Sequence, residues 1–394
     1  MAICRRTKQK INASRHFLLD RMKLTKITLP FICREPVLAL GSQSKNTLCF
    51  ARRNCAYLTR VHPDLDRPQD FSDFRKDLEL LFKKKPKIIA CDLHPEYQST
   101  RQAFKLAACG YRLIMAQHHH AHIAACMAEN GIRNQKVIGV AFDGTGLGPD
   151  NTLWGGEFLL CDYRNFARRA HLKEIPLIGA SQAIKEPWRL TAAWLDCIYK
   201  DKFLKQGIAF TDGIDKKKWL VLKSIRSSGV NSPLSSSMGR LFDAVSSLVL
   251  KKYNSGFEAE LALELERRAY AYRGKTTPYP FNIKKRQGVF IIDPALIFKE
   301  AVKDLKAARP VEEISYRFHL SIARMIVRVA GLLRDDSGVN KVALCGGVFQ
   351  NRLLSDMSQE SLKTARFAVL RQGKLSPGDS GLSLGQAAVA SFKE

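Results

Sequence analysis

The sequence has no closely spaced pair of cysteines, although ten of its 394 residues are cysteine. Without a C-x-x-C pair it cannot supply the paired thiolate ligands of a structural zinc finger. The scattered spacing gives no sign of a disulfide framework either. We therefore expect reduced, mostly buried thiols that fill the core as small apolar side chains.

Long apolar runs are missing as well. No stretch approaches the roughly 18 apolar residues that cross a bilayer, and the first residues lack the apolar block of a secretory signal. The expectation is a cytoplasmic protein with no membrane partner.

Acidic residues are few, because 37 Asp and Glu face 64 Lys and Arg, which gives a net charge of +27. Such a surplus attracts polyanions, acidic protein surfaces and phosphorylated ligands without naming one of them. The basic residues are spread along the chain and lack the interleaved aromatic residues of a single-strand binding surface. Nucleic acid is therefore not an expected partner, and solvated surface charge is the simpler interpretation.

The charge and the apolar pattern of the chain change near residue 36. Residues 1–35 are basic and follow no sustained apolar period, which indicates a leader or a linker remnant. From residue 36 to residue 394, short apolar runs alternate with helical segments, as in α/β proteins. Two buried runs end in glycine turns, one near residue 143 and one near residue 346. A glycine turn after a buried strand can face a phosphate, and two of them suggest two similar halves. This pattern favours an α/β fold of two actin-like lobes, with a nucleotide in the cleft between the lobes.

Four histidines stand within five positions of the segment AQHHHAHIAACMAEN. The segment is rich in alanine and free of glycine and proline, which predicts a helix over residues 116–130. His118 and His122 are four residues apart, so they lie on one helix face and can share a metal ion, while His119 and His120 point elsewhere. Merely polar helix residues are the alternative, but packing alone explains so many neighbouring histidines poorly.

Two histidines rarely complete a metal site, so we look for carboxylates at strand ends and in loops. Asp143, which ends an apolar strand in AFDGTG, is the first candidate. Asp379, which precedes the last helical segment in SPGDSGLSLGQ, is the second. An ordinary acid at a helix N-terminus is an equally good interpretation of Asp379 from its local sequence.

Glycines mark a candidate nucleotide site. The glycines of AFDGTG let a phosphate approach the backbone closely. CGGVFQN places Gly346 and Gly347 between a buried strand and a helix, so backbone N–H groups favour an anion there, although a plain tight turn is the alternative. MGRLFDAV places Gly239 and Asp243 four apart on a helix, where the acid can accept ribose hydroxyl protons. Each motif is weak by itself.

Taken together, these segments resemble the C-terminal domain of the hydrogenase maturation carbamoyltransferase HypF. The resemblance spans about residues 36–394 in family order. Its main strings are QHHHAHIAACMAE, VIGVAFDGTGLGPDNTLWGGEFL, SSSMGRLFDAV, VALCGGVFQNRLL and SPGDSGLSLGQAAVA. More widely, the chain is similar to the tRNA threonylcarbamoyladenosine-forming enzymes, which share the actin-like fold (ASKHA, ribonuclease H-like) and a His-x-x-x-His metal pair.

The resemblance implies functions for two groups of residues. The catalytic metal ligands would be His118, His122, Asp143 and Asp379. The nucleotide site would be lined by Gly144, Thr145, Gly239, Asp243, Gly346, Gly347 and Asn351. The metal would be iron or zinc, since two imidazoles and two carboxylates suit either. The nucleotide would be carbamoyl-adenylate, ATP or AMP.

The implied activity is the transfer of a carbamoyl group from carbamoyl-adenylate to the C-terminal cysteine of a HypE-like protein in nickel-iron hydrogenase maturation. The acylphosphatase-like, zinc-finger and YrdC-like domains of HypF are not recognisable in this sequence. A separate YrdC-like protein is therefore expected to form the carbamoyl-adenylate. Two alternatives stay open: carbamoylation of another acceptor, either a small molecule or tRNA adenosine, and a metal- and nucleotide-binding relative that has lost turnover.

One segment departs from the family pattern. GFEAELALELE, residues 256–266, stands where the family has a Glu-Gly-Gln-Ala-Ala string. Ala259 and Glu260 are therefore less permissive than the residues they replace, and the fit of the substrate is expected to be less secure than the binding of the metal.

Overall fold

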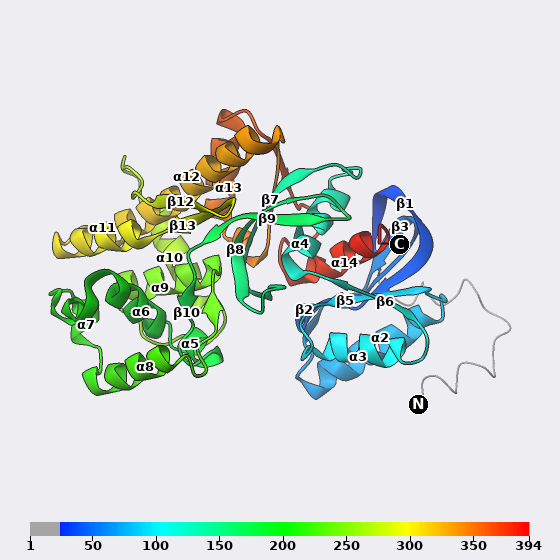
Figure 1. The fold of residues 1–394 in the computed structure, drawn as a ribbon, viewed down its shortest axis with the longest axis horizontal. Coiled ribbons are helices and arrows are strands. Elements are labelled where there is room, and N and C mark those ends of the chain that lie inside the picture. Colours follow the sequence, from blue (N-terminus) through cyan, green and yellow to red (C-terminus); the bar gives the residue numbers. More distant parts are fainter. Residues whose placement is uncertain (1–23, 394) are drawn as a thin grey trace. The chain divides into compact units, whose positions relative to one another are not determined.

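The computed structural model describes residues 24–393, which form two compact units. Unit 1 contains residues 24–135, 162–165 and 372–393, and unit 2 contains residues 136–161 and 166–371. The expected α/β class is confirmed, because each unit combines helices with a mixed sheet (Figure 1). Residues 1–23, most of the expected leader, lie outside the described residues.

Unit 1 is built on a four-stranded sheet with the strand order β3-β1-β5-β6. β1 (Thr25–Ala39) pairs antiparallel with β3 (Cys49–Leu58) and parallel with β5 (Ile88–Asp92), which in turn pairs parallel with β6 (Arg112–Ala116). The remaining elements of unit 1 are a short strand pair, helices and a 3-10 turn: β2 (Ser44–Asn46), β4 (His62–Asp64), α2 (Pro68–Phe82), α3 (Gln98–Ala107), α4 (His118–Glu129), η3 (Asp379–Gly381) and α14 (Leu382–Ala390).

β1 begins before residue 36, inside the segment that the sequence assigned to the leader. Its first residues pair with the end of β3, and Ile27 and Leu29 are buried. The register shifts between Thr28 and Cys33 and again between Cys33 and Val37. Such irregularities break the period-2 pattern by which a strand is recognised in a sequence.

α4 confirms the helix expected over residues 116–130. Every residue from His118 to Ala128 is buried, as is typical of a helix packed on all sides. α14 packs against it so closely that a Cβ at Gly385 would overlap the carbonyl oxygen of Ala121. A glycine is therefore required where the two helices meet.

Unit 2 is built on a larger sheet with the path β12-β13-β9-β8-β7-β14-β15. Its strands, including two short ones beside β8, are β7 (Val137–Leu147), β8 (Leu153–Cys161), β9 (Phe166–Leu172), β10 (Ile175–Pro176), β11 (Leu234–Ser235), β12 (Asn282–Arg286), β13 (Val289–Asp293), β14 (Lys341–Cys345) and β15 (Ala368–Arg371). Its helices and 3-10 turns are α5 (Ser181–Lys185), α6 (Trp188–Tyr199), η1 (Lys200–Lys205), α7 (Ala209–Asp212), α8 (Lys216–Ser228), α9 (Met238–Leu250), α10 (Glu260–Ala271), α11 (Ala295–Lys306), α12 (Val311–Ser337), η2 (Gly347–Gln350) and α13 (Arg352–Thr364).

β7 and β14 are parallel neighbours, with Cys345 opposite Ala141. The backbone at Gly144 and the glycine turn that follows β14 therefore lie close together in one sheet. The sequence predicted that the first strand ends at Asp143, but β7 continues to Leu147 through a bulge. Both turns belong to unit 2, whereas the sequence suggested one turn for each half of a two-lobed fold. The pairing of β7 with β14 places both turns in unit 2. A local sequence pattern does not show which strands become neighbours.

The expectation for the cysteines is confirmed for the described part of the chain. All nine described cysteines are free thiols, and the buried ones are Cys33, Cys49, Cys91, Cys126, Cys161 and Cys345. Burial raises the pKa of Cys91 to about 12, so this thiol stays neutral. Among residues 24–393, no helix combines the length and the apolar composition that crossing a membrane requires.

Ala259, at the start of α10, lies in the left-handed region with φ 62° and ψ 13°. A Cβ in that region costs about 1 to 2 kcal/mol relative to glycine. The strained residue lies in the segment that departs from the family pattern, and the effect of this departure on substrate fit stays a prediction.

Replacing Ala259 with glycine should raise the free energy of unfolding by about 0.5 to 1 kcal/mol, because the relief of strain exceeds the added entropy of the unfolded chain. The same replacement at Ala262, in the interior of α10, should lower that free energy by about 1 kcal/mol. Urea unfolding of both variants measures the two differences. Equal destabilisation by both would show that Ala259 is not strained.

Candidate functional site

The histidine pair of unit 1 lies in the first turns of α4. The helix starts where the side-chain oxygen of Gln117 accepts a hydrogen bond of 2.8 Å from the His120 backbone N–H. His118 and His122 share one helix face, are each 1% exposed, and bring their Nε2 atoms within 3.2 Å of each other.

The other two histidines point away from the pair, as the helical period predicts. His119 Nδ1 is 3.1 Å from the side-chain nitrogen of Gln117. His120 Nε2 donates a hydrogen bond of 2.6 Å to the Asp162 carbonyl, and burial lowers the pKa of His120 to about 4. The i, i+4 pair is thus separate from its neighbours in the run.

Asp379 reaches this pair from the opposite end of the sequence. Its Oδ1 lies 3.5 Å from Nε2 of His118 and 3.5 Å from Nε2 of His122. The segment before α14 is held in place from both sides. The Thr47 hydroxyl donates to the Ser380 carbonyl at 2.9 Å, and Glu129, at the end of α4, accepts the Gly373 N–H.

The three ligand atoms have the spacing that a metal ion requires. In a tetrahedral site with zinc–nitrogen distances of about 2.0 to 2.1 Å, neighbouring ligand atoms are about 3.3 Å apart. The separations between His118 Nε2, His122 Nε2 and Asp379 Oδ1 are 3.2, 3.5 and 3.5 Å. Two imidazole nitrogens and a carboxylate oxygen are suitable donors for zinc or iron, so the residues fit such an ion.

Asp92 contacts the histidine pair, and sequence reasoning did not select it. It ends β5, and its Oδ2 lies 2.7 Å from Nδ1 of His118, with both side chains 1% exposed. A carboxylate in this position keeps the proton on Nδ1 and leaves the Nε2 lone pair for a metal. The available signal was an acid at the end of a buried strand, in the string ACDLHPEYQST.

Replacing Asp92 with asparagine should weaken metal binding by about 10- to 100-fold, because the neutral amide holds the imidazole less firmly. Titration of zinc against a chromophoric chelator measures the affinity. Asp77→Asn is the matched control, since Asp77 pairs with the buried His62 at 3.1 Å elsewhere in unit 1. Equal losses in both variants would exclude a specific role for Asp92.

In unit 2, Asp143 lies in a bulge of the sheet. The pairing of β7 with β8 shifts register between Phe142 and Gly146, so Asp143, Gly144 and Thr145 leave the regular ladder. Asp143 is 8% exposed, and its Oδ1 accepts hydrogen bonds from the backbone N–H groups of Gly144 at 2.8 Å and Gly347 at 3.2 Å. The carboxylate thereby joins the two glycine turns.

The N-terminus of α9 packs directly on this bulge. The Ser237 hydroxyl donates to the carbonyls of Asp143 and Gly144 at 2.7 Å and accepts the Arg240 N–H at 3.1 Å as the helix cap. A Cβ at Gly239 would lie 2.8 Å from the Cα of Gly144, so only glycine fits. This packing places a helix N-terminus beside the bulge.

The second glycine turn closes over the same strand end. Gly346 has φ 95°, and a Cβ there would overlap the Phe142 carbonyl oxygen. The sequence-selected Gly144, Gly239, Gly346 and Gly347 therefore lie together in unit 2. Asp243 follows one turn along α9, and burial raises its pKa, opposed by the neighbouring Arg240.

Asn351 has a structural role in addition to its predicted one. Its Oδ1 caps α13 by accepting the Leu354 N–H at 2.8 Å, and its Nδ2 donates to His319 Nε2 at 2.9 Å. His319 in turn donates from Nδ1 to the Ser315 carbonyl at 2.8 Å. One N–H of the Asn351 amide remains for a ligand, and its part in a nucleotide site stays a prediction.

Burial lowers the pKa of His319 to about 4 from 6.5. Between these pH values the imidazole is protonated in the unfolded chain but stays neutral in the folded protein. The free energy of unfolding therefore falls as the pH falls from about 6.5 toward 4. The loss should be about 1.4 kcal/mol per pH unit from this residue. Urea unfolding at about pH 7 and about pH 5 should show a smaller loss for His319→Gln than for the wild type. An unchanged pH dependence would contradict the assignment.

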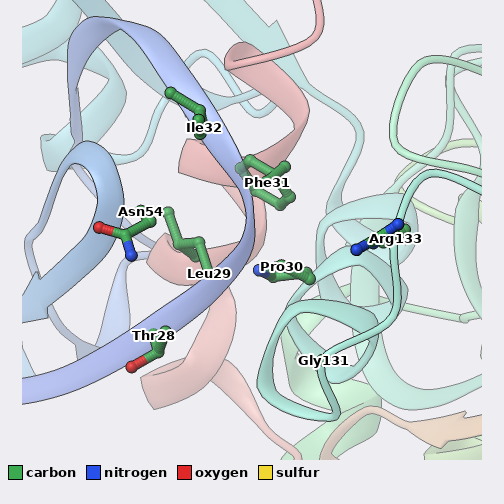
Figure 2. Close-up of a pocket in the computed structure, with 8 residues that line it drawn as sticks. All are labelled: Thr28, Leu29, Pro30, Phe31, Ile32, Asn54, Gly131 and Arg133. Carbon is green, nitrogen blue, oxygen red and sulfur yellow. The ribbon is translucent and has the colours of Figure 1, made fainter.

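A pocket of about 490 Å³ lies elsewhere in unit 1, beside the first half of β1 (Figure 2). Its lining is mostly apolar or uncharged, with Arg133 as the charged member, and consists of Thr28, Leu29, Pro30, Phe31, Ile32, Asn54, Gly131 and Arg133. The lining contains none of the candidate residues chosen from the sequence, so we propose no function for this pocket.

Comparison with known families agrees with this description. The chain matches the model of the HypF Kae1-like domain over residues 33–129, and the model of the carbamoyltransferase, Kae1-like domain, second subdomain, over residues 139–386. The fold is therefore that of a Kae1-like carbamoyltransferase domain. It is 37% identical to carbamoyltransferase HypF of Rhodobacter capsulatus over 93% of its length. The chain belongs to the HypF family of carbamoyltransferases.

The chain spans about half of that relative, 48% of its length. A carbamoyltransferase HypF homolog of Cupriavidus necator is 34% identical and is matched over 91% of its own length and 90% of this chain.

Two solved structures share the fold. They are full-length HypF in the phosphate- and nucleotide-bound form (TM-score 0.86, 35% identity, 93% of this chain and 47% of that one) and HypF of T. kodakarensis (TM-score 0.83, 28% identity, 94% and 48%).

Proposed function

We propose that the chain transfers a carbamoyl group from carbamoyl-adenylate to the C-terminal cysteine of a HypE-like protein in nickel-iron hydrogenase maturation. The observation that carries the proposal is the donor set of buried His118 and His122 with the partly exposed Asp379. Asp92 orients His118, and the chain belongs to the HypF family. Membership of the family supports the reaction class, and the donor set supports a metal-dependent form of it.

His118, His122 and Asp379 would hold one divalent ion, iron or zinc, with Asp143 of unit 2 as the fourth ligand. When bound, such an ion supplies Lewis acidity that polarises the carbamoyl carbonyl. Asp92 keeps the proton of His118 on Nδ1, so Nε2 stays available as a donor. The assignment of Asp143 rests on the sequence and on the placement of its carboxylate in the bulge of β7.

The nucleotide would bind through the groups gathered in unit 2. Gly346 and Gly347, together with Gly144 and Thr145, would line the phosphate side of the site, where Asp143 accepts the N–H groups of Gly144 and Gly347. Gly239 would complete this lining through its close contact with the Gly144 backbone. Asp243 would accept ribose hydroxyl protons, and Asn351 would contribute its remaining amide N–H. The phosphate- and nucleotide-bound form of full-length HypF, which shares this fold, supports a nucleotide as ligand.

The transfer itself breaks one bond and makes one. The acceptor thiolate sulfur attacks the carbamoyl carbon and forms a C–S bond. The bond from that carbon to the phosphate oxygen breaks, and AMP leaves with the electron pair. The carbamoyl-adenylate would come from a YrdC-like protein acting on carbamoyl phosphate and ATP. We place the reaction in the cytoplasm, with neither a membrane nor nucleic acid as a partner.

The proposal is tested by incubating the full chain with labelled carbamoyl phosphate, ATP, a YrdC-like protein and a HypE-like acceptor. Label should appear on the acceptor, and removal of its C-terminal cysteine should abolish that label. Label on tRNA or on a small molecule instead would support another acceptor. Absence of transfer with a metal-loaded chain to every acceptor would overturn the proposal.

His122→Ala should remove most of the bound metal and abolish transfer, because the loss of one ligand opens the site. Elemental analysis of the purified protein measures the metal directly. His119→Ala is the matched control on the same helix, and it should keep its metal because His119 lies outside the cluster. Unchanged metal content in His122→Ala would remove this residue from the ligand set.

A further inference from the structure

Arg240 is a buried guanidinium that the roles assigned so far do not explain. It lies in the first turn of α9 and is 5% exposed. Its Nη2 pairs with Asp243 Oδ2 at 3.1 Å. None of the described residues offers a hydrogen-bond partner to its Nε or to its Nη1. Most of its five N–H donors are therefore buried without an acceptor, which is costly unless a ligand supplies one.

The surroundings of Arg240 favour an anion. The guanidinium is at the N-terminus of a 13-residue helix, where the helix dipole is positive. A Cβ built at Gly144 would lie in ordinary contact, 3.4 Å from Arg240 Nη2 and 3.9 Å from Glu258 Oε1, so the bare glycine backbone borders the guanidinium directly. Two features therefore indicate an anion site beside Arg240: the N-terminus of α9 and a buried guanidinium whose Nε and Nη1 have no hydrogen-bond acceptor among the described residues.

The ion pair with Asp243 identifies which part of an anionic ligand lies there. Asp243 is the proposed acceptor for ribose hydroxyl groups, and Arg240 is its immediate neighbour at 3.1 Å. In a nucleotide, the anionic group attached to the ribose is the α-phosphate. A planar fork of N–H donors matches two oxygens of a phosphate, whereas a lysine would offer only a point charge.

We propose that Arg240 binds the α-phosphate of the adenine nucleotide, so that it holds the carbamoyl-adenylate by the phosphate from which the carbamoyl group departs. This inference rests on the proposed nucleotide site and adds a ligand-binding residue to it. The guanidinium would also neutralise the charge that grows on that phosphate as AMP leaves. Asp243, whose Oδ2 is 3.1 Å from Nη2, balances the charge of Arg240 when no phosphate is bound.

The test compares the binding of AMP with the binding of adenosine, by calorimetry on the full chain with verified metal content. The wild type should bind AMP more tightly than adenosine. Arg240→Gln should weaken AMP binding by about 10- to 100-fold, the loss expected for a hydrogen-bonded charge pair. Adenosine affinity should change by less than about twofold. Arg240→Lys, which keeps the charge and loses the fork, should fall between the two.

Asp243→Asn is the matched variant in the same helix, and it should weaken AMP and adenosine equally. Thermal unfolding confirms that each variant is folded. If Arg240→Gln weakens both ligands equally, or if the wild type does not distinguish them, Arg240 is not a phosphate ligand and the proposed nucleotide site still stands. If the wild type binds neither ligand, the nucleotide site and this inference both fail.

Discussion

The contact between α4 and α14 is the constraint on which the site of unit 1 depends. The two helices come from segments more than 250 residues apart, and they approach so closely that Gly385 must lack a side chain where it meets Ala121. This contact fixes the turn that carries Asp379 against the buried face that carries His118 and His122. A larger residue at Gly385 would separate the donors, so helix packing and metal chemistry are coupled through one backbone contact.

Hydrogen bonding within unit 1 then gives the histidines a defined chemistry. A buried imidazole can carry its proton on either nitrogen, and only a partner for one nitrogen settles which of them is a donor to a metal. Asp92 is that partner for His118. The same principle separates His119 and His120 from the pair, because each is already engaged with Gln117 or with the Asp162 carbonyl. Neighbouring histidines of one run thus have different roles.

In unit 2, the residues of the proposed nucleotide site gather beside a buried sheet. The parallel pairing of β7 with β14 places two glycine turns together, and the Ser237 cap holds the N-terminus of α9 against the first of them. The excess of positive charge over the whole chain, +27, does not determine this site. The arrangement depends instead on strand pairing and on the Ser237 cap, which act at short range.

The sequence by itself determined the features that follow a local period or a contiguous string. The four-residue spacing of His118 and His122 needs only a helix to bring them onto one face, and the strings around Asp143, Gly239, Gly346 and Asp379 indicate the family before any contact is known. Only the tertiary structure decided what depends on distant segments: the approach of Asp379 to the histidines, Asp92 beside His118, the meeting of both glycine turns in one unit, and the burial of Arg240. Their partners are far away in the chain, and the free energy that selects them comes from packing and hydrogen bonding after the chain has folded back on itself.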